Sequence, residues 1–75
     1  MPKLPAITAK ELISALKKAG FIEAGQKGSH LKLINLDNRR RVIVPLHAVK
    51  SIRKGTLNAI LKGADISKHQ LVELL

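Results

Sequence analysis

The segment 27–33, Lys-Gly-Ser-His-Leu-Lys-Leu, carries the residue types best suited to chemistry in this chain. A glycine leads into alternating polar and apolar residues, and alternation sends successive side chains of a strand to opposite faces of a sheet. If Leu31 and Leu33 face the core, His30 and Lys32 lie together on the other face. An imidazole exchanges protons near neutral pH, and a lysine beside it can bind an anion. This pattern indicates His30 as a candidate catalytic residue next to a bound phosphate.

RNA is a substrate on which such a site can act. Its 2′-hydroxyl lies next to each phosphate and is a built-in nucleophile, so a histidine that moves the proton and a cation that stabilises the developing charge can suffice without a metal. Lys27, Ser29 and Lys32 surround His30 in the sequence and are candidate phosphate-binding residues. The alternative is a solvated surface, since a single exposed lysine or strand histidine more often has no catalytic role.

Further basic residues follow the candidate site along the chain. Arg39, Arg40 and Arg41 begin the next predicted strand, so alternate members are expected on the face of His30. An arginine there can hold a phosphate through two parallel hydrogen bonds. The alternative role of this run is to protect an edge strand from aggregation. His47 is either a second proton carrier or phosphate donor, or a loop residue that fixes the corner after the strand.

A third basic cluster, formed by Lys50, Arg53 and Lys54, lies just before a predicted helix. The free backbone amides and the dipole at a helix start already favour phosphate. The cluster therefore suits an RNA nuclease and a non-catalytic RNA-binding protein equally well.

The composition favours a polyanionic partner. The 75 residues include 14 Lys and Arg against 5 Asp and Glu, a net charge of +9, and such a field attracts nucleic acid. Phe21 is the only aromatic residue, so bases have no row of rings on which to stack, and recognition is expected through phosphates. Cysteine is absent, and His30, His47 and His69 lack ligand-like spacing. Neither a metal nor another cofactor is therefore expected.

A single domain over residues 1–75 is expected, since this length is near the small end of what folds unaided. No segment is long and apolar enough to span a bilayer, and the first residues lack the apolar region of a signal peptide. The sequence thus predicts a cytoplasmic protein without membrane contact.

The predicted order of elements along the chain is one helix, three strands and two further helices. Hydrophobic periodicity predicts three helices, over residues 8–19, from Gly55 or Thr56 to Ala64, and over 67–74. Capping boxes mark the start of the first and third helices. Alternation predicts three strands, over 21–26, 29–36 and 39–44. A glycine turn over 25–28 should join the first two strands, and Pro45 should end the last. The fold class is α+β, with an antiparallel sheet covered on one face.

These residues, in this order, resemble the HicA toxin family. The resemblance rests on Gly28-Ser29-His30 on a strand, on Arg40 to Pro45 followed by His47, and on Gly55-Thr56-Leu57 opening a helix. It covers about residues 12–66 and implies a fold similar to a double-stranded-RNA-binding domain, in the order helix, three strands, helix. It also implies that His30 is the catalytic residue. The short helix after Ile66 lies outside the shared pattern.

The function that the resemblance implies is that of a metal-independent endoribonuclease, an mRNA interferase that cleaves messenger RNA and arrests growth. Its implied protein partner is a HicB-like antitoxin that covers the face of His30 with an acidic or otherwise complementary surface. One alternative is a non-catalytic double-stranded-RNA-binding module with the same fold. Another is a basic structural domain, which would show no salt-dependent binding of RNA.

Overall fold

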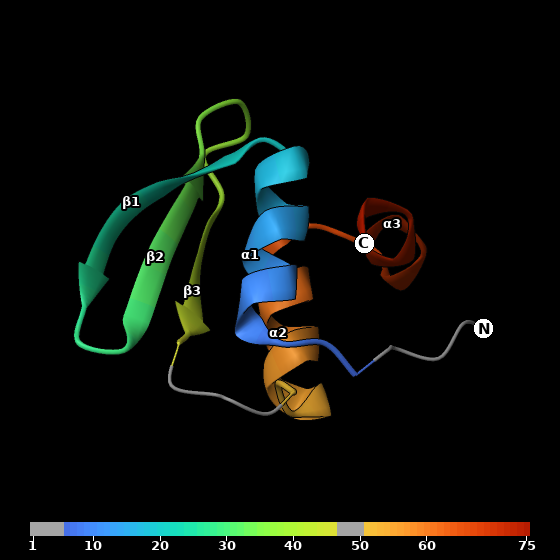
Figure 1. Ribbon diagram of the computed structural model, residues 1–75. Coiled ribbons are helices and arrows are strands. Elements are labelled where there is room, and N and C mark those ends of the chain that lie inside the picture. The colour runs from blue at the N-terminus through green and yellow to red at the C-terminus, as the bar shows by residue number, and fades with distance from the viewer. Residues whose placement is uncertain (1–5, 47–50) are drawn as a thin grey trace.

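The computed structural model describes residues 6–46 and 51–75. Its elements follow in the order α1 (Ala9–Lys18), β1 (Phe21–Lys27), β2 (His30–Asn35), β3 (Arg41–Pro45), α2 (Lys54–Ala64) and α3 (Lys68–Leu74). The three strands form an antiparallel sheet with β2 in the centre. The helices lie on one side of this sheet (Figure 1), which confirms the predicted α+β fold class.

The first and third helices begin where the sequence predicts, each after a capping box. At the start of α1 the Glu11 amide donates to the Thr8 hydroxyl and the Thr8 amide donates to the Glu11 carboxylate. Ser67 and Gln70 make the same reciprocal pair before α3. These bonds satisfy backbone donors that have no partner within the helix.

The second helix begins one or two residues earlier than predicted, at Lys54. Arg53 takes the cap position in an extended conformation and makes no side-chain capping bond. Because no capping side chain marks this start, the sequence signal was weaker than for the other two helices. Asp65 ends the helix in the left-handed conformation.

The connection between β1 and β2 is shorter than the predicted glycine turn over 25–28. β1 continues through Lys27, whose partner in β2 is His30, so only Gly28 and Ser29 form the turn. The register shifts between Glu23 and Gly25, which is the extra residue of a β-bulge. The prediction was wrong because this bulge keeps Gly25 within the strand.

The third strand starts at Arg41, two residues later than predicted, and includes Pro45, one residue beyond the predicted end at Val44. The prediction that Pro45 ends the pairing was wrong, because Pro45 is the partner of His30 and the Leu46 amide still donates to the Ser29 carbonyl. Arg39 has a positive φ of 60°, and the Asn38 side-chain oxygen accepts the Arg40 amide at 2.9 Å. This side-chain bond holds a loop in place of the first two expected strand residues. Asn35, the buried polar residue of β2, secures the other side of the loop by accepting the Asp37 amide.

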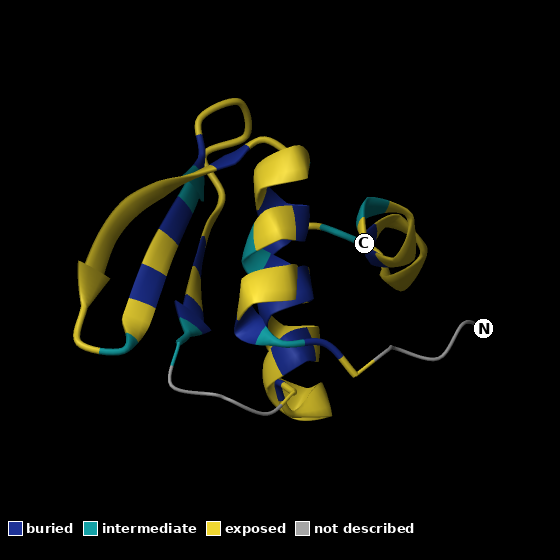
Figure 2. Ribbon diagram, in the orientation of Figure 1, coloured by how far each residue is buried: buried dark blue, intermediate teal, exposed yellow. Residues whose placement is uncertain are grey.

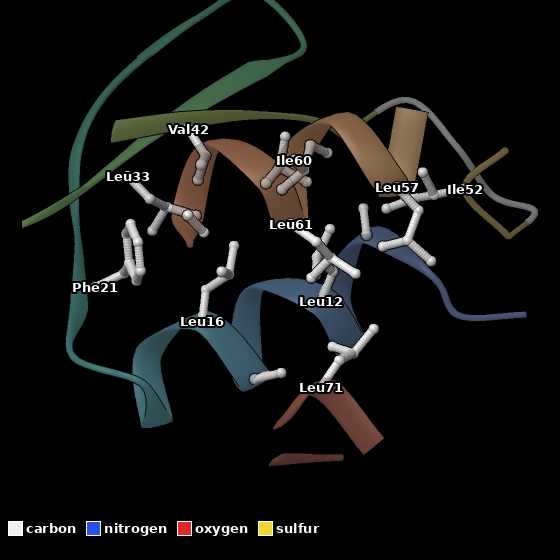
Figure 3. Packing of buried hydrophobic residues seen from close by; sticks show 14 of the residues in the cluster. Leu12, Leu16, Phe21, Leu33, Val42, Ile52, Leu57, Ile60, Leu61 and Leu71 are labelled. Atoms are coloured by element: carbon white, nitrogen blue, oxygen red, sulfur yellow. The ribbon is translucent and has the colours of Figure 1, made fainter. Parts of the chain in front are cut away.

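The core lies between the sheet and the first two helices. Leu33 and Val42 from the sheet meet Leu16 of α1 and Ile60 of α2 in this layer (Figure 3). Leu71 attaches α3 to the core from the far side of α1. Alternate residues of β2 and β3 are exposed on the opposite side of the sheet (Figure 2). Over residues 6–46 and 51–75, no helix has the length and apolar character needed to span a membrane.

Candidate functional site

The exposed side of the sheet, called the outer face below, has three rows of cross-strand partners. The row next to the β1–β2 turn contains Lys27, His30 and Pro45. The middle row contains Gly25, Lys32 and Ile43, and the far row contains Ile22, Ile34 and Arg41. Partners opposite each other in a ladder share a face. Leu31 and Leu33 are buried and His30 and Lys32 exposed, so the predicted division of β2 into core and outer residues is confirmed.

The backbone on both sides of His30 is fixed by hydrogen bonds. The Gln26 side chain donates to the carbonyl of Gly28 at 3.0 Å. The Leu46 amide donates to the carbonyl of Ser29, which extends the pairing of β2 with β3 beyond His30. Gly28 has a φ of 59°, and a positive φ at the first turn position only is the pattern of a type II′ hairpin turn. His30 therefore follows directly after a tight turn, and as the first residue of β2 it pairs with β1 on one side and β3 on the other.

An open depression of about 780 Å³ lies over this end of the outer face. It is lined by Gly25, Gln26, Lys27, Gly28, Ser29, His30, Lys32 and Ile43. Gly25 has no side chain to fill the space opposite Lys32, and a Cβ there would meet no atom within 4 Å. The depression can therefore admit a backbone phosphate between His30 and the lysines.

The charge of the outer face has one sign. Lys27, Lys32 and Arg41 are exposed on it, whereas the acidic residue of β1, Glu23, pairs with Leu33 on the helix side. Its carboxylate lies 2.6 Å from the Lys17 ammonium of α1. The remaining acidic residues, all within the described ranges, lie on helices or loops: Glu11, Asp37, Asp65 and Glu73. The sheet thus presents cations without local neutralisation, which favours a polyanion.

The structure brings together some of the predicted site residues and separates others. Lys27, Ser29, His30 and Lys32 line one depression. Arg41 is on the same face but opposite Ile34, which is four residues along β2 from His30, or roughly 13 Å at the rise of a strand. It can therefore contact a different phosphate of the same chain.

The other basic residues lie elsewhere. Arg39 and Arg40 are in the loop at the end of the sheet opposite the β1–β2 turn (Figure 1), so the prediction that this run begins a strand beside His30 is wrong for these two. Arg53 and Lys54 are exposed at the start of α2, in the helical layer. His47 and Lys50 lie outside the described residues, and their predicted roles stay predictions.

Two residues around the site were missed in the sequence. Gln26 holds the turn through the Gly28 carbonyl, and Ile43 lines the depression beside Lys32. The alternation of Ile43 with two buried valines indicates that Ile43 is on the outer face. Its position beside Lys32 could not be predicted, because the partner of Ile43 in β2 depends on the register of the two strands. No sequence signal indicated Gln26, because the bulge that precedes it changes which way the rest of β1 faces.

Among the described residues, no three His, Cys, Asp or Glu side chains are grouped so that they could hold a metal ion. A search of curated proteins finds no match to this chain. The family model described as HicA toxin of bacterial toxin-antitoxin matches residues 9–66. The matched range begins with α1 and ends just after α2, so it includes the whole sheet and leaves α3 outside.

Proposed function

Because the chain belongs to the HicA family of bacterial toxin–antitoxin systems, we propose that it is an endoribonuclease that cleaves messenger RNA with His30 as the proton-transfer residue. The observation that carries this proposal is the position of His30 in a depression lined by lysines on an uncovered basic sheet face. Growth arrest would follow from the loss of messenger RNA, and the cytoplasm would be the site of action.

The proposed reaction uses the nucleophile that RNA provides. The 2′-oxygen attacks the adjacent phosphorus while His30 accepts the hydroxyl proton, and the bond from phosphorus to the 5′-oxygen breaks. The products are a 2′,3′-cyclic phosphate and a 5′-hydroxyl end. The 5′-oxygen leaves with a proton supplied by water or by a second side chain. The bond from phosphorus to the 5′-oxygen is replaced by a bond from phosphorus to the 2′-oxygen, a reaction that needs no redox partner and no metal.

The cations of the outer face have distinct proposed roles. Lys27 is the cross-strand partner of His30, and Lys32 follows two residues later on the same face, roughly 7 Å along the strand. These lysines can hold the scissile phosphate and stabilise its added negative charge in the transition state. Ser29 lines the same depression and can donate a hydroxyl proton to a phosphate oxygen. Arg41 would bind a phosphate farther along the strand.

A cleavage assay with a matched histidine control tests the proposal. We expect His30→Ala to slow single-turnover cleavage of a messenger RNA by about 10²–10⁴-fold, the usual contribution of acid–base catalysis. His69→Ala should cleave like the wild type, because His69 is exposed on α3. Both rates should persist in excess EDTA. Cleavage by His30→Ala at the wild-type rate would refute the role of His30, and loss of activity in EDTA would refute the metal-independent reaction.

A non-catalytic double-stranded-RNA-binding module is the second candidate function. The exposed Arg53 and Lys54 at the start of α2 favour it, since this cluster lies apart from His30. It predicts that wild type and His30→Ala both leave RNA intact while binding it with strong salt dependence. The same pair of variants therefore separates the two functions.

The family pairs its toxins with an antitoxin, and we propose that a HicB-like antitoxin neutralises this chain by covering the outer face. A partner with acidic groups would complement the exposed cations there. Substrate and antitoxin would then compete for one surface.

A further inference from the structure

Aliphatic side chains are exposed on the same face as the cations. Ile22 is 48% exposed and Ile43 is 56% exposed, and both belong to the outer face. Between them lies the partly exposed Ile34. Isoleucine is usually a buried residue, and three of them together on the open face of a sheet need a reason.

The register arranges these isoleucines as a diagonal. Ile22 is the direct cross-strand partner of Ile34. Ile34 is opposite Arg41, and Ile43 lies two residues farther along β3, opposite Lys32. Diagonal neighbours in an antiparallel pair are about 7–8 Å apart, within reach of long side chains. The apolar diagonal therefore crosses all three strands, with Lys32 and Arg41 on either side of it.

The aliphatic side chains of this diagonal do not provide the contacts by which proteins usually bind RNA. The proposed substrate is held through phosphates, which bind cations and hydrogen-bond donors. Bases are held by stacking on aromatic rings, and an isoleucine offers no ring. In contrast, specific protein interfaces combine a desolvated apolar centre with a polar rim. The outer face combines the same two kinds of surface, with apolar isoleucines along a diagonal and the cations Lys32 and Arg41 on either side of it.

We propose that Ile22, Ile34 and Ile43 are the anchors of the antitoxin, while the substrate binds the cations that flank them. The fitting partner surface has apolar side chains at its centre and carboxylates around them, opposite Lys32 and Arg41. Ile43 borders two depressions, the one at His30 and a second that reaches α2. A protein seated on the diagonal would therefore cover Lys32 and block the path to His30. The part of this inference that concerns cleavage rests on the proposed nuclease activity, and the part that concerns binding rests on the proposed antitoxin alone.

The test compares threonine variants in binding and in cleavage. Threonine keeps the β-branched shape that suits a strand but replaces apolar surface with a hydroxyl. The probe is the HicB-like antitoxin proposed above, titrated calorimetrically into the full-length chain. We expect Ile22→Thr and Ile43→Thr each to weaken this binding by at least about fivefold. Ile22→Thr should also cleave RNA within about twofold of the wild type, because Ile22 lies outside both depressions.

Val72→Thr is the matched control, because Val72 is 47% exposed on α3, away from the sheet. It should change neither binding nor cleavage. The inference is overturned if this antitoxin does not bind the wild type, or if both isoleucine variants bind as tightly as Val72→Thr. It is also overturned if Ile22→Thr loses cleavage in proportion to binding. A wild type that binds this protein but cleaves no RNA would refute the nuclease and leave the binding result to decide the anchors.

Discussion

The backbone conformation of Gly28, in the turn just before His30, predicts that alanine will have opposite effects on stability at Gly28 and at Gly55. Gly28 has a φ of 59°, a conformation that costs an L-residue about 1–2 kcal/mol. Gly55 lies in the first turn of α2, with ordinary helical geometry and no atom within 4 Å of where a Cβ would be. Replacement of the two by alanine should therefore change the stability of the protein in opposite directions.

The magnitudes follow from these geometries. Alanine reduces the conformational freedom of the unfolded chain, which favours folding by about 0.4–1 kcal/mol at a compatible position. Gly55→Ala should gain this amount. Gly28→Ala gains it too but must adopt the strained φ, so the net result is a loss of about 1 kcal/mol. Because both alanines reduce the freedom of the unfolded chain equally, the two variants should differ by the strain alone, roughly 1–2 kcal/mol, or about 4–16 °C in the midpoint of thermal unfolding for a domain of this size.

Thermal and urea unfolding of the two variants beside the wild type measure this difference. Cleavage by Gly28→Ala should also fall while the protein is still folded, since a distorted turn displaces His30 from the lysines. Gly55→Ala should cleave normally at the same temperature. If Gly28→Ala proves as stable as Gly55→Ala, the turn does not hold residue 28 at a positive φ, and the placement of His30 argued from it is wrong.

Three further predictions concern stability and RNA affinity. Asn35→Ala should lose about 1–3 kcal/mol on urea unfolding, because its side chain makes two hydrogen bonds from a buried position. Asn38→Ala, with one exposed bond, should lose less than about 1 kcal/mol, and equal losses would contradict the reasoning from burial. Lys32→Gln and Arg41→Gln should each lower the slope of log affinity for RNA against log salt by about 0.7–1, and an unchanged slope in filter binding would exclude a phosphate contact. His30→Ala should stay within about 0.5 kcal/mol of the wild type in thermal unfolding, since its side chain is exposed, and a loss of several kcal/mol would place it in the core.

Local patterns in the sequence were enough for the elements whose signals lie within a few residues. The capping box of Thr8 and Glu11 fixed the start of α1, and the alternation of Leu31 and Leu33 fixed which face of β2 is buried. Both signals depend on side chains three or two positions apart, and tertiary contacts did not override them. The start of α2 was less certain because Arg53 offers no capping bond.

The sequence by itself determined that the chain is basic, that it forms an α+β fold, and that His30 and Lys32 are exposed together. Only the tertiary structure decided which residues from other strands join them. The bulge between Glu23 and Gly25 sets the register of β1 and leaves a glycine opposite Lys32. The loop through Arg39 removes two arginines from the sheet and leaves Arg41 in the far row. Register depends on the pairing of strands and on loop geometry, so the composition of the outer face could not be read along one strand.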